Sequence, residues 1–279
     1  MGCRAKCRKL MRVTMPEPFL KWPGGKRWLT RRHTDLFPAK FGRYIEPFLG
    51  GGAVFFGLKP KDARLSDTNS ELINAYNQIK DGWAALEKTL RQYQIKHNKS
   101  FYYKVRGQLL KDPVAQAARF LYLNRTCFNG IYRVNRKGEF NVPIGTKSAV
   151  AFEDGYLESV AAALRDTLIR QLDFAKAIDE ATGGDFVFVD PPYTVMHNNN
   201  GFVKYNALLF SWADQTRLAK AIRAAAARGV LVMMSNANHS SVRALYADFG
   251  LHHILTRSSV LAGDPSRRQA STELLVTNY

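Results

Sequence analysis

The sequence is poor in cysteine, and this excludes two classes of protein. Three cysteines in 279 residues, at positions 3, 7 and 127, are too few for a disulfide framework and indicate a reducing compartment. Cys3 and Cys7 have no histidine or cysteine partners at zinc-binding spacing, so the sequence predicts no metal site. The six histidines are scattered, and no spacing supports a Ser-His-Asp triad.

Long hydrophobic runs are absent as well. No apolar run approaches the roughly 18–20 residues needed to span a bilayer, so we expect no membrane insertion. Residues 1–14 form a basic N-terminal tail, which is not a secretory signal because no apolar stretch follows it. The hydrophobic content of 46% is that of a globular protein with a full core.

Acidic residues are scarce relative to basic ones. The chain has 23 Asp and Glu against 41 Lys and Arg, which gives a formal net charge of +18. Solubility alone requires a smaller net charge. We therefore expect a polyanionic partner, and nucleic acid is the polyanion that fits best.

The residues that are present centre on the tetrapeptide Asp190-Pro191-Pro192-Tyr193. The apolar run 185–189 before it predicts a buried strand, and parallel α/β sheets bind ligands beyond the carboxyl ends of their strands. The two prolines leave two peptide nitrogens without N–H, so the backbone there offers carbonyls but few donors. Acceptors beside an aromatic face suit a planar amine, such as the exocyclic amine of adenine. The simpler alternative is a strand that ends in a Pro-Pro corner, but the flanking Asp190 and Tyr193 favour a site.

A first glycine turn, Pro23-Gly24-Gly25, lies between Trp22 and Lys26. Its glycines allow positive φ and close approach of the backbone to a ligand. An aromatic face and a cation beside such a turn suit a zwitterionic or nucleotide-like ligand. Taken alone, the pattern also fits an ordinary loop with a packed tryptophan.

A second glycine turn follows a short strand at 44–46. Gly50, Gly51 and Gly52 open an apolar helix, as in the first βα turn of a Rossmann-like sheet, although the pattern is neither GxGxxG nor a Walker motif. The next strand ends in Asp67, at the separation of roughly 15–20 residues expected for an acid that accepts from ribose hydroxyls. Asp67 could equally cap the following helix.

The segment 124–141 is basic, rich in amides and interleaved with aromatic residues. Arg and Asn side chains can read base edges, and Phe or Ile can wedge between base steps. Asn129-Gly130 and Lys137-Gly138 are turn signals, and the second predicts a hairpin. We interpret the segment as part of a DNA-reading insertion; the alternative is a surface hairpin with solvated charges.

These segments together predict an α/β fold. It is a Rossmann-like sheet with an inserted, mostly helical DNA-recognition domain that carries a β-hairpin. Residues 15–80 and 148–279 are the expected first and second parts of the catalytic domain, and residues 81–147 are the expected insertion. Strands expected at 252–255 and 273–277 would close the sheet in the antiparallel direction.

The ordered set of motifs resembles the Dam-type DNA adenine-N6 methyltransferases, the D12 class or alpha group. The resemblance runs from Phe19 to Tyr279 and rests on FLKWPGGK, EPFLGGGAVF, LSDTN, LNRTCFNGIYRVNRKGEFNVPIG, the Asp173-Phe174 pair, DPPY and ELLVTNY. It implies a sheet that binds S-adenosyl-L-methionine. It also implies a site-specific enzyme that transfers a methyl group to N6 of adenine in double-stranded DNA by base flipping.

The resemblance also implies roles for individual positions. The catalytic motif is matched by Asp190, Pro191, Pro192 and Tyr193. Positions that hold S-adenosylmethionine are matched by Trp22, Pro23, Gly24, Gly25, Lys26, Glu46, Pro47, Phe48, Gly50, Gly51, Gly52, Asp67, Asp173, Phe174 and Asp190. Positions that contact DNA are matched by Lys21, Asn124, Arg125, Phe128, Asn129, Ile131, Arg133, Asn135 and Lys137.

The resemblance makes GATC the expected recognition sequence. In relatives that read GATC, an Arg at the place of Arg133 reads guanine, and an aromatic residue at the place of Phe128 stacks in the duplex. Here Phe stands where some relatives have Tyr, and Thr126-Cys127, Tyr132 and Val134 differ from the Dam pattern. The alternatives are another sequence, RNA instead of DNA, or a nucleic-acid-binding relative without catalysis.

The resemblance finally implies a biological setting. We expect a monomeric, cytoplasmic enzyme that associates with the nucleoid of a bacterial or phage-infected cell. A cognate restriction endonuclease is one partner that the family allows. Because the proposed chemistry is mostly positioning and electrostatics, it requires no metal.

Overall fold

The structure is a computed structural model that describes residues 16–135, 138–195, 210–258 and 270–279. The expected tail at 1–14 and the predicted DNA contact Lys137 lie outside the described residues.

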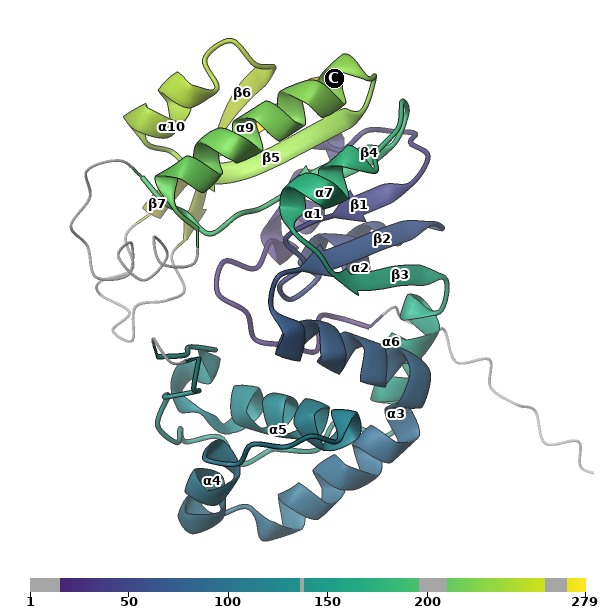
Figure 1. Cartoon of the computed structure of the whole chain (residues 1–279), viewed down its shortest axis with the longest axis vertical. Coiled ribbons are helices and arrows are strands. Elements are labelled where there is room, and N and C mark those ends of the chain that lie inside the picture. The colour runs from purple at the N-terminus through teal and green to yellow at the C-terminus, as the bar shows by residue number, and fades with distance from the viewer. Residues whose placement is uncertain (1–15, 136–137, 196–209, 259–269) are drawn as a thin grey trace, which may run out of the picture.

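A seven-stranded sheet with the order β3-β2-β1-β4-β5-β7-β6 forms the centre of the molecule (Figure 1). Five strands pair in parallel, namely β1 (Tyr44–Glu46), β2 (Ala63–Asp67), β3 (Thr167–Gln171), β4 (Phe186–Val189) and β5 (Leu231–Ala237). β7 (Ala270–Thr277) pairs antiparallel with both β5 and β6 (Leu251–Ser258). This arrangement confirms the α/β class, the mostly parallel sheet and its antiparallel close.

The sheet is covered on both faces because its central strands are apolar on both faces. Ile45, Val187 and Val189 belong to one buried cluster, whereas their neighbours Tyr44 and Phe188 belong to another. Successive side chains of a strand point to opposite faces, so the two clusters are the two sides of one sheet.

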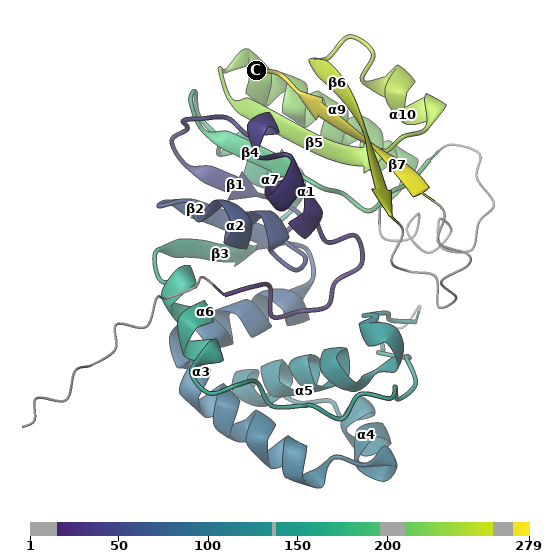
Figure 2. The same ribbon diagram turned by 180° about the vertical axis from the view of Figure 1, so that it is seen from behind.

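Different helices cover the two faces, as comparison of Figures 1 and 2 shows. On one side lie α7 (Phe174–Asp179), α9 (Trp212–Ala227) and α10 (Ser240–Leu245). On the other lie α1 (Arg27–Arg32) and α2 (Ala53–Leu58), with the short helix η1 (Thr34–Leu36) after α1.

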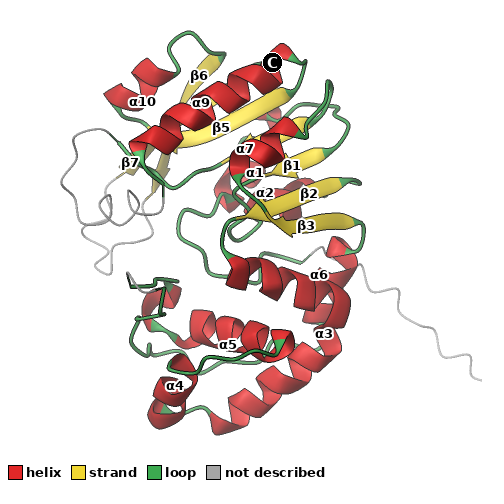
Figure 3. Ribbon diagram, in the orientation of Figure 1, coloured by secondary structure: helices red, strands yellow, loops and turns green. Residues whose placement is uncertain are grey.

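A helical segment connects β2 to β3. It contains α3 (Ser70–Lys96), α4 (Lys99–Arg106), α5 (Pro113–Thr126), the 3-10 turn η2 (Phe128–Gly130) and α6 (Tyr156–Leu164). In the part of this segment that the structure describes, Figure 3 shows helices and loops. The expected hairpin is reduced there to an isolated antiparallel bridge between Val134 and Phe140.

The helical segment is continuous with the rest of the fold. α3 spans the expected domain boundary after residue 80. Its backbone is not helical at Gly82, where φ is −151°, so two helical stretches meet there at a kink. Leu86 and Leu90, beyond the kink, belong to the same buried cluster as Tyr76, so the sheet and the helical segment share a core.

The strand order places a binding site at one edge of the sheet. β1 lies between β2 and β4, so the direction of chain winding reverses next to β1. In open α/β sheets, ligands bind beyond the carboxyl ends of the strands at such a switch point. β1 and β2 end there in Glu46 and Asp67, and Asp190 follows β4 directly.

We expect Gly250→Ala to destabilise the fold. Gly250 has a φ of 64°, and a Cβ there would lie 2.1 Å from the carbonyl oxygen of Thr277 on β7. Positive φ costs an alanine about 1–2 kcal/mol, and the clash adds to it. Gly155→Ala is the matched control, since Gly155 has a φ of 76° and open space at its Cβ.

Urea unfolding of both variants measures the difference. Gly250→Ala should lose about 2 kcal/mol more than Gly155→Ala. Equal losses in the two variants would contradict the close approach of residue 250 to β7.

Candidate active site

A cavity of about 960 Å³ lies at the carboxyl ends of β1, β2 and β4. All four predicted catalytic residues line it. The predicted cofactor residues line it too, except Pro47. Segments that are far apart in the sequence, around Trp22, Gly51, Asp67, Asp173 and Asp190, thus meet at one cavity.

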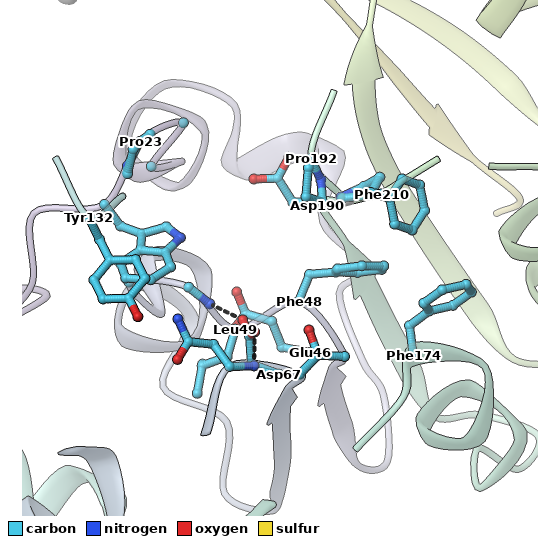
Figure 4. A pocket seen from close by; sticks show the side chains of 18 of the residues that line it. Pro23, Glu46, Phe48, Leu49, Asp67, Tyr132, Phe174, Asp190, Pro192 and Phe210 are labelled. Carbon is cyan, nitrogen blue, oxygen red and sulfur yellow. Dashed lines mark hydrogen bonds between the residues drawn. The ribbon is translucent and has the colours of Figure 1, made fainter. Parts of the chain in front are cut away.

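The walls of the cavity differ in character (Figure 4). Tyr132 and Pro23 lie on one side and Phe48 and Phe174 on the other, with acidic side chains between them. Phe48 stacks on Phe174 with ring centroids 5.3 Å apart, and the Phe210 ring meets Phe48 edge-on at 5.5 Å. The wall formed by Phe48, Phe174 and Phe210 therefore presents apolar faces suited to a flat ring.

Glu46, at the end of β1, is a buried acid with a raised pKa. Its side chain accepts a hydrogen bond from the Tyr44 hydroxyl at 2.9 Å. Burial raises the pKa of Glu46 to about 8, and the nearby charges of Asp190 and Asp67 contribute to the rise. As long as no cation lies next to Glu46, these surroundings favour its protonated form.

Asp67, at the end of β2, is fixed by backbone donors. Its carboxylate accepts from the N–H of Gly50 at 3.1 Å and from the N–H of Asn69 at 3.0 Å. Burial raises the pKa of Asp67, while these donors oppose the rise. The cap of α3 is Asn69, which accepts from the N–H of Leu72, so Asp67 is available to a ligand.

Lys26 carries the positive charge among these acids. Its side chain is 2% exposed, and its Nζ lies 2.9 Å from Asp190 Oδ2 and 3.6 Å from Glu273 Oε2. It also donates to the Gly24 carbonyl at 2.7 Å. The Pro-Gly-Gly turn therefore directs the Lys26 side chain towards the DPPY motif.

Tyr193 is held by the strands beside it. Its hydroxyl lies 2.8 Å from Ser235 Oγ on β5 and donates to Glu273 Oε2 on β7 at 3.0 Å. Burial, together with the charges of Asp190 and Glu273, raises the pKa of Tyr193 well above its usual value. The phenol stays neutral, and its ring has a fixed place at the cavity wall.

Asp173 is engaged by an arginine that the sequence did not single out. It caps α7 through the N–H of Ala175, and Arg217 of α9 binds both its oxygens at 2.7 and 2.9 Å. These bonds from Arg217 lower the pKa of Asp173. The Arg217 guanidinium also lies 4.0 Å from the Phe174 ring centroid, so it orders this edge of the cavity.

Trp22 connects the cavity to the helical segment. Its ring stacks on Tyr132, with centroids 5.5 Å apart and an interplanar angle of 20°. The Tyr132 hydroxyl donates to Glu71 at 2.7 Å. A Cβ at Gly50 would lie 2.7 Å from the Trp22 ring, so residue 50 must have no side chain where the indole packs on the glycine loop.

Two of the predicted DNA contacts, Asn124 and Arg125, make hydrogen bonds to the backbone of the chain itself. Asn124 is fully buried; its amide exchanges two hydrogen bonds with the backbone of Lys21, at 3.0 and 2.8 Å. Arg125 donates to the carbonyls of Ala149 and Ala151. These two side chains connect α5 to neighbouring segments of the chain, because they lie on faces of α5 that pack against those segments.

Other predicted DNA contacts lie on the surface or at the cavity. Phe128 is 53% exposed, and Asn129 and Arg133 are exposed as well. Ile131 and Arg133 line the cavity. Asn135 instead bonds Glu139 through its amide, which fixes the loop on which Arg133 lies.

Lys21 is part of a positive patch. Burial lowers the pKa of its ammonium, and the charges of Lys147 and Arg125 lower it further. Lys21, Lys147 and Arg125 thus lie close together, and gathered cations favour an anion such as a phosphate. Lys147 was not among the predicted DNA contacts, because it lies outside the motifs from which those contacts were chosen.

Several cavity residues were missed, notably Tyr132, Phe210, Arg217 and Glu273. Glu273 had a signal in the sequence, since it is a single acid at the start of the apolar run Leu274–Val276. A carboxylate on a buried strand costs free energy unless it has hydrogen-bond donors or a cation as partners.

The described ranges 16–135, 138–195, 210–258 and 270–279 contain neither a membrane-spanning helix nor a metal-binding cluster. No helix there has both the length and the apolarity to cross a bilayer. Nor does any group of three or more His, Cys, Asp or Glu side chains there have a metal-binding arrangement.

Known proteins resemble this chain over nearly its whole length. The family described as D12 class N6 adenine-specific DNA methyltransferase matches residues 22–260. The Type II methyltransferase M1.LlaDCHI of Lactococcus lactis subsp. cremoris is 41% identical, covering 94% of this chain and 95% of its own length.

More distant relatives carry related names. The Type II methyltransferase M.MjaIII of Methanocaldococcus jannaschii is 34% identical, covering 94% of this chain and 99% of its own. The DNA adenine methylase of Haemophilus influenzae is 31% identical, covering 98% and 97%.

We expect Glu46→Gln to change the pH dependence of stability. A folded-state pKa of about 8, above the ordinary 4.5, means that the protonated carboxyl stabilises the fold fully below pH 4.5. That contribution is lost as the pH rises through 8. Relative to wild type, the uncharged Gln should gain roughly 1–4 kcal/mol between pH 5 and 9.

Urea unfolding across this pH range gives the answer. Glu180→Gln is the control, because Arg170 lowers the pKa of Glu180 and its contribution stays nearly constant above pH 5. The control should keep the wild-type pH slope. The same slope in Glu46→Gln would refute the raised pKa.

Proposed function

The chain belongs to the D12 class N6 adenine-specific DNA methyltransferases, and we propose that its substrate is an adenine flipped out of double-stranded DNA, within the sequence GATC. The observation that carries the proposal is the cavity in which Asp190-Pro191-Pro192-Tyr193 lies beside the acids at the ends of β1 and β2.

The cavity fits S-adenosylmethionine. Acidic residues in its lining outnumber basic ones by seven to three, and this excess favours a ligand with positive sulfonium and ammonium groups. The acids are Glu46, Asp67, Glu71, Asp173, Asp190, Asp214 and Glu273, and the cations are Lys26, Arg133 and Arg217. Asp67 retains lone pairs for ribose hydroxyls, and the aromatic wall offers apolar faces to a purine. When bound, this cofactor supplies an electrophilic methyl group.

The DPPY motif provides what a target amine needs. Asp190 and the Pro191 carbonyl are acceptors for its two hydrogens, and these bonds direct the nitrogen lone pair towards the methyl donor. Tyr193 offers its ring face to the base. The protein forms no covalent intermediate, so its contribution is positioning and electrostatic stabilisation.

The position of this motif supports base flipping. The N6 amine of a paired adenine is inaccessible inside a duplex, and Asp190 lies within the cavity, so the base must leave the stack to reach it. The exposed Phe128 can fill the space that the base leaves.

Duplex DNA and GATC rest on the segment after α5. Arg133 is exposed at the cavity, with its Nε held by Asn141 at 3.0 Å, and a positioned guanidinium suits bidentate contact with guanine. Lys21 and Lys147 supply charge for the phosphate backbone. The names of the relatives, which include DNA adenine methylase, favour DNA over RNA.

We expect Asp190→Ala to abolish methyl transfer. Loss of the acceptor removes the group that orients the amine, so turnover on a GATC duplex should fall by at least about 1000-fold. DNA affinity should stay within a few-fold of wild type, because the DNA contacts lie elsewhere.

Transfer of labelled methyl groups and a DNA-binding titration measure the two effects. Asp179→Ala, at an exposed carboxylate outside the cavity, is the control and should keep full activity. Substantial turnover by Asp190→Ala would remove Asp190 from the catalytic role.

We expect Arg133→Ala to relax specificity at one base pair. Bidentate contact with guanine is worth about 1–3 kcal/mol, so discrimination at that position should fall by roughly 5- to 150-fold in kcat/KM. The assay compares GATC with duplexes changed at one base. Arg165→Ala, at an exposed arginine after α6, should leave discrimination intact. Unchanged discrimination in Arg133→Ala would rule out this role.

A further inference from the structure

We propose that Glu273 is a positioning residue for methyl transfer, which fixes the Tyr193 ring and shares the Lys26 ammonium with Asp190. The inference rests on the proposed function of the DPPY motif and assigns a new role to the terminal strand. Glu273 acts through its neighbours.

The fold places Glu273 in a position that is costly for a carboxylate. It lies on β7, opposite Ala237 of β5 and Leu255 of β6, and is 4% exposed. The residues that follow it, Leu274 and Leu275, are buried and apolar. A buried carboxylate requires hydrogen bonds and a counter-charge, and both come from the active site.

The first contact of Glu273 fixes Tyr193. Glu273 Oε2 accepts from the Tyr193 hydroxyl at 3.0 Å, and Ser235 Oγ lies 2.8 Å from the same hydroxyl. The phenol is thus held from two adjacent strands, β5 and β7. A ring held in this way is in place before the target base arrives, which lowers the cost of stacking.

The second contact of Glu273 concerns Lys26. The same Oε2 lies 3.6 Å from Lys26 Nζ, and Asp190 Oδ2 lies 2.9 Å from that nitrogen. The ammonium is therefore shared by two carboxylates. When Asp190 accepts the hydrogens of an amine, Glu273 keeps the buried ammonium neutralised. Without Glu273, Lys26 would bind Asp190 alone and compete with the substrate.

A purely structural role would have different consequences. If Glu273 only compensated a buried charge, its replacement would lower the amount of folded enzyme and leave the turnover of the folded fraction unchanged. A positioning role lowers kcat in molecules that are fully folded. Separate measurements of stability, kcat and KM distinguish the two.

The experiment compares Glu273→Gln and Glu273→Ala in the full chain with a GATC duplex. Gln keeps an acceptor for Tyr193 but removes the charge next to Lys26. We expect kcat to fall about 10-fold in Gln and about 100-fold in Ala, with KM for S-adenosylmethionine within about 3-fold of wild type. Glu180→Gln, at an ion-paired glutamate remote from the cavity, should match wild type.

Two further readouts locate the effect. A duplex with 2-aminopurine at the target position reports whether the extruded base is stacked in the site, and its fluorescence on binding should differ between Ala and wild type. In a Tyr193→Phe background, Glu273→Ala should cost less than in wild type, because part of its effect passes through the hydroxyl.

The outcomes separate this inference from the function on which it rests. Wild-type kcat in folded Glu273 variants, or a change confined to KM for the cofactor, would overturn the positioning role alone. Failure of the wild-type enzyme to methylate adenine in the duplex would overturn the proposed function instead.

Discussion

The site depends on one buried ammonium among carboxylates. Lys26 is almost inaccessible to water, and its ammonium lies 2.9 Å from Asp190 and 3.6 Å from Glu273, so these charges stabilise one another. The pair joins the N-terminal glycine turn to the strand end that carries Pro191 and Pro192. The remaining acids, Glu46 and Asp67, have no cation of their own in the contacts described, and a cationic cofactor is the natural complement of this imbalance.

Side-chain contacts connect the cavity to the proposed DNA-contacting segment. Trp22 stacks on Tyr132, and Asn124 fastens the backbone of Lys21 to the end of α5. The residues proposed to contact DNA and those proposed to contact the cofactor are therefore directly connected. Because α3 also shares its core with the sheet, the sheet and the helical segment between β2 and β3 form one continuous fold.

Much of this arrangement could be predicted from the sequence, because glycines, prolines and acids at strand ends occupy places that the topology of a parallel sheet determines. The partners of Glu273 and Arg217 could not, since each of these residues meets its partner across the fold at a distance the sequence does not encode. The burial of Asn124 could not be predicted, because composition does not reveal which face of α5 is buried. The kink at Gly82 lies close to the domain boundary expected after residue 80.

The most direct test of the account is to incubate the protein with S-adenosylmethionine and unmethylated genomic DNA and to sequence the product for modified bases. The account predicts N6-methyladenine confined to GATC. N6-methyladenine in another motif would contradict the assigned specificity and keep the chemistry. DNA without N6-methyladenine, from a protein that binds the cofactor, would contradict the central claim that the DPPY cavity receives an adenine from duplex DNA.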